Sequence, residues 1–424
     1  MTVAAGTAAS QAITMAFVPL ITRLYGPEAY GLQGIFMSVV SLLTAVAAFG
    51  YPIAIVLPKH DSDALGLARL SVAIGIATAS TGAIVFLFFG PALLKLLNAE
   101  AISAFMYLIP VPMFIAVLTD VLNQWLIRKK AYVLTAKVNV LTTVVISSVK
   151  TGLGLVHPSA LVLIATNMVG GLLGAALTYL GWRRLSAHQT AVTLPSQSSA
   201  TLRELAIRHR DFPLLRTPQT LINAFSQSLP VLLLAGYFGA GTAGQYAIAI
   251  SVLGMPAGLI GGSVMAVFYP RINEAIRNGE NARRLIVKAT GAMAVVGALP
   301  YLVVLAAGPY LFQLAFGEKW HTAGIYAQLL AGWLFLQFVN KPAVSAIPAL
   351  RLQGGLLVYE FFSTGTKILA LWLGFRIFKS DVAAVALFSA FGIAAYIFLI
   401  LWVIRCSAKA VARSVGTQAR IYDE

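Results

Sequence analysis

Two lysines stand inside long apolar segments of this sequence, where a positive charge is costly. Lys150 lies within TTVVISSVKTGLGL (142–155), and Lys367 lies within EFFSTGTKILALWLG (360–374). A cation at the centre of a membrane-spanning helix costs about 3 kcal/mol or more on insertion scales. Either the side chain snorkels to the membrane surface, or the protein uses the charge to hold an anion. Both lysines are therefore candidate anion ligands, with snorkelling as the alternative for each.

A stripe of polar residues follows one face of a third apolar segment, RTPQTLINAFSQSLP (216–230). Arg216, Gln219, Asn223 and Gln227 recur at steps of three, four and four, so they share one face of a helix. A single amide in such a position commonly forms an interhelical hydrogen bond worth about 1 kcal/mol. A whole stripe headed by an arginine is more typical of a water-filled cavity, and its amides suit an uncharged ligand rich in hydroxyl groups.

Two carboxylates also fall at membrane depth. Asp120 shares a helix face with Asn123 and Gln124, and Glu360 shares a face with Lys367 at a distance of about 10 Å along the axis. Carboxylates inside membrane spans commonly carry protons or ions. Asp120 and Glu360 are therefore candidates for ion or proton coupling.

The sequence contains no motif that indicates a metal site, a cofactor site or an enzyme active site. It has one cysteine, Cys406, no P-loop, and no His, Cys and acidic residues at metal-binding spacing. No predicted outward-facing loop is long enough to carry catalytic groups, and no Ser/His/Asp arrangement is supported. We expect no metal, no cofactor and no enzymatic activity.

The elements that position these residues follow from the composition. Of 424 residues, 59% are hydrophobic and only 10% are charged, and the mean hydropathy is +0.85. A soluble domain would carry roughly 25% charged residues. Apolar runs of about 20 residues recur along the chain, which is the length of a spanning helix rather than of a barrel strand. The sequence therefore predicts an all-α, multi-pass membrane protein.

Apolar runs bounded by charge, glycine and proline predict twelve transmembrane helices. They cover residues 3–22, 31–57, 65–89, 102–126, 133–156, 158–182, 213–237, 243–267, 286–307, 322–347, 354–375 and 381–404. A polar, basic stretch interrupts the series after the sixth helix. It predicts an N-terminal six-helix bundle (1–182), a linker (183–211), a C-terminal six-helix bundle (212–405) and a tail (406–424).

Charge distribution predicts the orientation. The chain carries 30 Lys and Arg against 14 Asp and Glu, a net charge of +16. Most of these cations fall in segments on the side of the N-terminus, while the opposite side holds only Arg23, Lys95, Lys319, Arg376 and Lys379. Because cytoplasmic loops are enriched in Lys and Arg, both termini and the linker are predicted to be cytoplasmic. The same rule explains the basic net charge, so no nucleic-acid partner is expected.

The two predicted bundles also repeat a short motif. YGPEAYG (25–31) and FGAGTAG (238–244) share an aromatic residue, a glycine, four further residues and a second glycine. Each motif lies between the first and second helix of its half, and each following helix ends in proline and a cation. Two halves in the same orientation form a parallel repeat, and transporters of this kind bind substrate between their halves.

Two longer stretches resemble a known family. ITRLYGPEAYGLQGIFMSVVSLLTAVAAFGYPIAIVLPKHD (21–61) resembles the opening of the Wzx-like O-antigen and oligosaccharide flippases, the polysaccharide branch of the multidrug/oligosaccharidyl-lipid/polysaccharide exporter superfamily. Residues 210–272 resemble the start of the second half of the same family. The resemblance implies a V-shaped pair of bundles around a cationic cavity in the bacterial inner membrane. It also implies flipping of an undecaprenyl-pyrophosphate-linked oligosaccharide from the cytoplasmic to the periplasmic leaflet, with other glycan-assembly membrane proteins as candidate partners.

On this hypothesis each candidate residue has a role. Lys150 and Lys367 would hold phosphate or an acidic sugar, while Arg23 and Arg216 would act nearer the two mouths of the cavity. The amides Gln219, Asn223 and Gln227 would contact sugar. The rival hypotheses are a multidrug or cation antiporter of the same superfamily and a membrane enzyme of glycan assembly. An antiporter of this type would favour carboxylates in the first helix, and residues 3–22 contain none.

Overall fold

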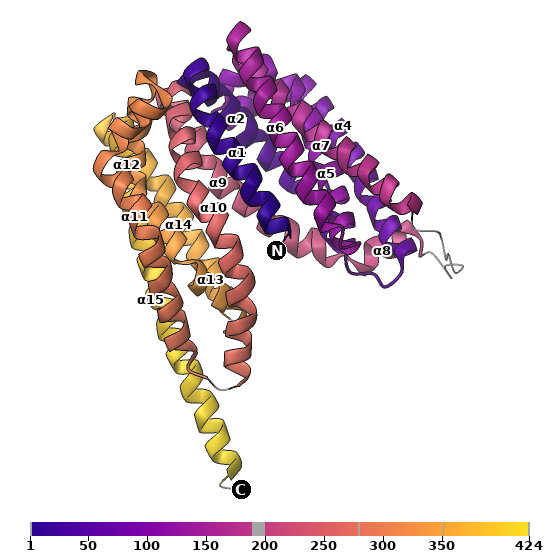
Figure 1. Ribbon diagram of the computed structural model, residues 1–424, viewed down its shortest axis with the longest axis vertical. Helices are drawn as coiled ribbons and strands as arrows, with labels where there is room; N and C mark the ends of the chain where they lie inside the picture. The colour runs from indigo at the N-terminus through magenta and orange to yellow at the C-terminus, as the bar shows by residue number, and fades with distance from the viewer. Residues whose placement is uncertain (1, 189–199, 279, 351, 423–424) are drawn as a thin grey trace. The chain divides into compact units, whose positions relative to one another are not determined.

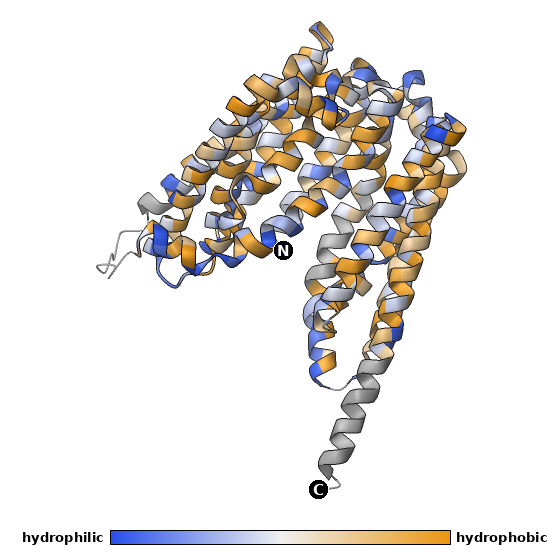
Figure 2. Ribbon diagram, turned by 180° about the vertical axis from the view of Figure 1, so that it is seen from behind, coloured by the Kyte–Doolittle hydropathy of each residue, from blue (hydrophilic) through white to orange (hydrophobic). Residues whose placement is uncertain are grey.

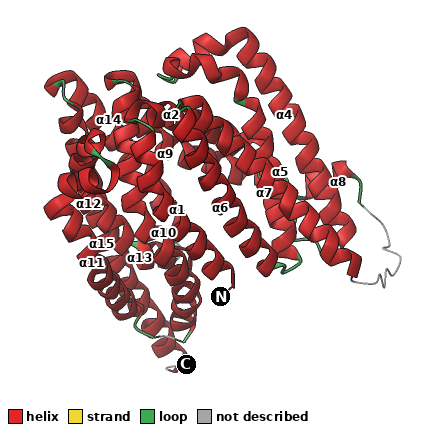
Figure 3. Cartoon of the chain, turned by 45° about the horizontal axis from the view of Figure 1, so that its top comes forward, coloured by secondary structure: helices red, strands yellow, loops and turns green. Residues whose placement is uncertain are grey.

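The protein is described by a computed structural model covering residues 2–188, 200–278, 280–350 and 352–422. Of the residues in these ranges, 91% are helical, and no strand occurs among them (Figure 3). Ten helical segments in the described ranges are long and apolar enough to cross a membrane. Apolar residues run along the helices that Figure 2 colours by hydropathy. The predicted all-α, multi-pass membrane class is confirmed, whereas the count of twelve spans stays a prediction.

Two compact units divide the chain, residues 1–247 and 248–424. The predicted division at the linker 183–211 stays a prediction, and the centre of that linker, 189–199, lies outside the described residues. The first unit contains the following helices (Figure 1): α1 (Thr2–Leu24), α2 (Pro27–Ala47), α3 (Tyr51–Ala54), α4 (Asp61–Leu96), η1 (Glu100–Leu108), α5 (Pro110–Arg128), α6 (Tyr132–Val156), α7 (Ala160–His188), α8 (Leu202–Arg208), η2 (Phe212–Arg216), α9 (Thr217–Phe238) and the first residues of α10 (Ala240–Arg277).

The core of the first unit joins helices that are distant in sequence. One cluster packs Ile35 and Phe36 of α2 against Ile102 of η1, Ile164 of α7 and Leu232 of α9. A second cluster joins the end of α2, α3, α4 and α5, and it includes Leu205 of α8. Helix α9 therefore belongs to the packed core of the first unit, which fixes its polar face relative to α2 and α5.

The second unit contains the rest of α10 and six further helical elements. These are α11 (Ala282–Phe316), η3 (Glu318–Trp320), α12 (His321–Val339), α13 (Lys341–Ala349), α14 (Gln353–Leu373), η4 (Gly374–Phe378) and α15 (Asp381–Tyr422). Helix α12 is the most enclosed of these elements. Its residues Tyr326 and Phe338 are fully buried, and so is Trp320 of η3, directly before it. A cluster on α10, α11, α13 and α15 forms the core at the other end of the unit.

Three predicted helices are interrupted, each for a local reason. The helix predicted over 31–57 ends at Ala47, because Phe49 and Gly50 adopt positive φ angles of 47° and 70°. The helix predicted over 102–126 begins as the 3-10 helix η1 and becomes α-helical only at Pro110. The helix predicted over 322–347 divides at Asn340, directly before Lys341 and Pro342. A proline removes one backbone donor and favours the first turn of a new helix.

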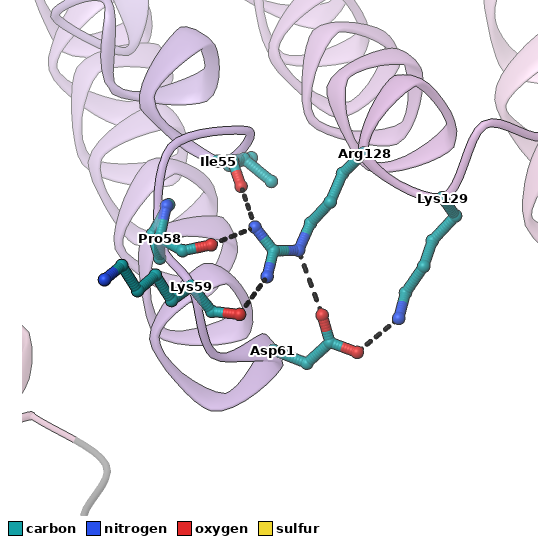
Figure 4. A network of polar contacts seen from close by, with 6 residues as sticks. All are labelled: Ile55, Pro58, Lys59, Asp61, Arg128 and Lys129. Carbon is teal, nitrogen blue, oxygen red and sulfur yellow. Dashed lines mark hydrogen bonds and ion pairs between the residues drawn. The ribbon is translucent and has the colours of Figure 1, made fainter.

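One arginine ties together the segment between α3 and α4 (Figure 4). The guanidinium of Arg128, at the end of α5, donates to the carbonyl oxygens of Pro58 at 2.6 Å and Ile55 at 3.3 Å. It also pairs with the Asp61 carboxylate at 3.0 Å, and Lys129 pairs with the other oxygen of Asp61. These contacts satisfy carbonyls that the end of α3 leaves without helical partners.

The segment after residue 199 packs against α4 and forms a hydrogen bond to it. Thr201 and Glu204 form a reciprocal capping box at the start of α8, and the backbone N–H of Ala200 donates to Asp63. Leu205 is fully buried. Partial burial, and to a lesser extent the neighbouring charge of Arg208, lower the pKa of His209.

The two repeated glycine motifs meet within the first unit. A Cβ atom on Gly31 would collide with the carbonyl group of Ala240, and one on Gly244 would collide with the carbonyl group of Pro27. The starts of α2 and α10 therefore cross backbone to backbone at Gly31 and Gly244, the last glycine of each motif. Only glycine permits this approach, which explains why both motifs carry it at that position.

Candidate functional site

Lys150 projects from α6 toward α7 inside the first unit. Its Nζ donates to Oδ1 of Asn167 at 2.6 Å, and the side chain is partly buried. The backbone carbonyl of Lys150 accepts a hydrogen bond from the hydroxyl of the buried Tyr25 at 2.9 Å. Gly154 leaves room for the Tyr25 ring, since a Cβ there would collide with it. The lysine thus has a neutral polar partner and no carboxylate partner in the described ranges, so its charge is uncompensated.

Lys367 lies in aromatic surroundings in the second unit. Its Nζ is 5.3 Å from the ring centroid of Trp333 on α12 and 5.6 Å from that of Tyr396 on α15. The hydroxyl of Tyr396 in turn accepts a hydrogen bond from Gln337 at 3.1 Å. Such cation–π contacts are worth roughly 0.5–2 kcal/mol each, depending on desolvation. Glu360, predicted to share its face, is exposed and forms no ion pair with Lys367 in the described part of the chain.

A cavity of about 580 Å³ opens in the first unit among α2, α3, α5 and α9. We call it the α5–α9 cavity. Its walls are aliphatic and include Met37, Val40, Ile53 and Val117. The polar groups on its lining come from three helices and are Ser41, Thr44, Asp120, Gln124, Thr220, Asn223 and Gln227. The volume lies within the range of small-molecule sites, about 300–1,000 Å³.

Only part of the predicted polar stripe lines this cavity. Asn223 and Gln227 line it, together with Asp120 from the facing helix α5. Gln219 instead accepts a hydrogen bond from Arg216 at 3.0 Å, and both residues are exposed and absent from the lining. Arg23 is exposed at the end of α1. The seven predicted binding residues therefore do not form one cluster. Two of the three amides, Asn223 and Gln227, line the cavity, while the two lysines have separate surroundings in different units.

Several residues of these sites escape prediction from the sequence. Asn167 is a single amide in an apolar helix, and nothing in its spacing links it to Lys150. Trp333 and Tyr396 look like ordinary core aromatics until the folding of α12 and α15 brings them to Lys367. Thr220 could have been found, because it lies between Gln219 and Asn223 near the polar face.

No group of three or more His, Cys, Asp and Glu residues in the described ranges could hold a metal ion. The polar groups that these sites offer are a lysine beside an amide, a lysine over aromatic rings, and a cavity lined by amides, hydroxyls and one carboxylate.

Ten helices in the described ranges that are long and apolar enough to cross a membrane define the class of protein as a multi-pass membrane protein. The chain belongs to the family described as "Polysaccharide biosynthesis protein", whose model matches residues 20–324. The resemblance read from residues 21–61 and 210–272 is thereby confirmed.

Two relatives carry names that describe their roles. The succinoglycan biosynthesis transport protein ExoT of Rhizobium meliloti is 22% identical over 339 residues, which is 79% of this chain and 64% of ExoT. The lipopolysaccharide biosynthesis protein WzxC of Escherichia coli is 26% identical over 158 residues, 37% of this chain and 32% of WzxC. The matches thus span less than two thirds of either relative's length.

Solved structures share the fold at low sequence identity. An inward-facing multidrug resistance transporter of the MATE family superimposes with a TM-score of 0.68 at 16% identity, covering 94% of this chain and 95% of that one. The lipid II flippase MurJ in an inward closed conformation superimposes with a TM-score of 0.66 at 12% identity, covering 99% and 92%. These likenesses show a common fold and do not choose between a drug and a saccharide as cargo.

Proposed function

We propose that this protein is a flippase that moves a polyprenyl-pyrophosphate-linked oligosaccharide across the bacterial inner membrane. The cargo would be an O-antigen unit or a related surface-polysaccharide repeat unit, turned from the cytoplasmic to the periplasmic leaflet. Family membership and the names of ExoT, WzxC and MurJ support this class of cargo. The twelve-span topology, cytoplasmic termini, paired six-helix bundles and alternating access belong to the same proposal.

The observation that carries the proposal is the set of partners around the Lys150 ammonium group. Lys150 lies on the candidate membrane span α6, and its ammonium group has an amide as its hydrogen-bond partner and no carboxylate partner among the described residues. A pyrophosphate cannot cross hydrocarbon without cations that replace its hydration, and charge-assisted hydrogen bonds supply that replacement. Lys150 would bind the pyrophosphate or an acidic sugar, with Lys367 as its counterpart in the second unit.

The remaining candidates take supporting roles. Arg23, Arg216 and Gln219 are exposed and would guide the anionic head group near the mouths of the pathway. Asn223 and Gln227 would hydrogen-bond to sugar hydroxyls in the α5–α9 cavity. Asp120 and Glu360 would couple transport to an ion or a proton. No enzymatic step is proposed.

Transport measurements on variants of Lys150 test this proposal. Lys150→Gln removes the charge and should reduce flipping of lipid-linked oligosaccharide at least tenfold, whereas Lys150→Arg keeps the charge and should retain it. Lys137→Gln is a matched control, because it removes an exposed cation from the same helix α6. Normal transport by Lys150→Gln would contradict the proposed role of Lys150.

The second candidate function is a multidrug or cation antiporter. It is favoured by one observation: Asp120 lines a cavity and has no ion partner in the described part of the chain. Thermal stabilisation of the purified protein separates the two functions. Stabilisation by undecaprenyl-pyrophosphate-linked oligosaccharide, weakened in Lys150→Gln and Lys367→Gln, supports the flippase. Stabilisation by a cationic drug alone supports the antiporter.

A further inference from the structure

The α5–α9 cavity has a composition that discriminates among sugars by charge. Its lining includes a single carboxylate, Asp120, and contains no lysine or arginine among the described residues. The nearest cations along its helices lie outside the lining: Arg128 pairs with Asp61, and Arg216 is exposed and donates to Gln219. The one charged residue on the lining is therefore acidic, although the protein as a whole is strongly basic.

The positions of the polar groups suit a sugar ring. Asp120 and Gln124 are one turn apart on α5, and Thr220, Asn223 and Gln227 occupy one face of α9 across the cavity. The carboxylate accepts hydrogen bonds only, whereas each amide both donates and accepts. Adjacent hydroxyls of a sugar can donate to the carboxylate and exchange hydrogen bonds with the amides, while its C–H faces pack on the aliphatic wall.

From this arrangement we infer that the α5–α9 cavity is a subsite for a neutral or amino sugar, and that Asp120 rejects uronic acids. An amino sugar would pair its ammonium group with Asp120. A uronate would face a like charge in a cavity that offers no cation, in surroundings where charges interact more strongly than in water. Specificity thus comes from a repulsive element as well as from attractive ones.

This inference rests on the proposed function. It assigns pyrophosphate binding and saccharide selection to different residues of the chain. The lysines would serve the anionic pyrophosphate, and the cavity would select the saccharide attached to it. Asp120 would then act on cargo choice in addition to its proposed part in ion or proton coupling.

Binding to three synthetic probes tests the inference. The probes are undecaprenyl pyrophosphate bearing one glucose, one glucosamine or one glucuronic acid, presented to the full-length protein in nanodiscs. For the unaltered protein, the dissociation constants of the glucose and glucosamine probes should be at least tenfold lower than that of the glucuronic acid probe. Asp120→Asn should reduce this difference to less than threefold.

A matched control and a folding check keep the test decisive. Asp211→Asn makes the same chemical change at an exposed position outside the cavity and should leave the tenfold difference intact. Each variant's melting temperature verifies that it is folded. Equal binding of all three probes to the unaltered protein, or an undiminished difference in Asp120→Asn, would overturn the inference while leaving the flippase proposal standing. Failure of all three probes to bind would overturn both.

Discussion

At the scale of single residues, the two lysines show two ways of holding a cation at membrane depth. Lys150 uses one short hydrogen bond to an amide, and Lys367 uses the faces of two aromatic rings. Neither arrangement neutralises the charge, so each leaves it available to attract an anion.

The hydrogen bond between Lys150 and Asn167 leads to a prediction about stability. Hydrogen bonds to charged groups are worth roughly 1.5–3 kcal/mol in soluble proteins and less in membranes. A double-mutant cycle of Lys150→Met and Asn167→Leu should give a coupling energy of about 1 kcal/mol, measured by reversible unfolding in mixed micelles. As a control, Lys137→Met combined with Asn167→Leu should be additive, because Lys137 is exposed at the start of α6. A coupling near zero for the first pair would mean that the amide does not hold the ammonium group.

At the scale of elements, interruptions of the helices matter as much as the helices themselves. The turn at Phe49 and Gly50 ends α2 beside the α5–α9 cavity, and both Ala48 and Gly50 line it. An unbroken helix over 31–57, as the apolar pattern predicts, would place a continuous cylinder along that wall. The Arg128 contacts then hold the segment after α3 in place (Figure 4).

At the crossing of α2 and α10, a Cβ added to Gly31 or Gly244 would come closer to a neighbouring atom than at the other described glycines of the first unit. Gly31→Ala should lower the free energy of unfolding by about 1–3 kcal/mol, because the added methyl group collides with backbone rather than with a flexible side chain. The measurement is the melting temperature or the denaturant midpoint of the purified variant.

Gly241→Ala is the matched control for this prediction. It lies in the same motif, FGAGTAG, yet a Cβ there meets nothing within 4 Å. Its stability should be unchanged or slightly raised, since alanine favours a helix over glycine. Equal effects of the two substitutions would mean that the close crossing does not form.

At the scale of the whole molecule, composition and periodicity are enough to predict the fold class and the shared faces of helices. The excess of apolar runs predicts an all-helical membrane protein, and the steps of three and four residues correctly place Asn223 and Gln227 on one face of α9. Periodicity could not reveal that Asp120 of α5 faces those amides, because that contact depends on how two helices pack. It also could not reveal that Gln219 lies outside the lining of the cavity, with its amide bonded to Arg216.

The orientation of the chain in the membrane is a prediction for the whole molecule, and the sequence makes it easy to test. Since Cys406 is the only cysteine, a Cys406→Ser background permits single-cysteine labelling with a membrane-impermeant maleimide in intact cells. Glu100→Cys and Arg376→Cys should react, because both side chains are exposed at positions predicted to face the periplasm. Arg203→Cys and Arg277→Cys, also exposed, should react only after the inner membrane is permeabilised. The charge asymmetry requires this pattern in both halves of the chain. The reverse pattern in either half would rule out two bundles in the same orientation, and with them the parallel repeat on which alternating access depends.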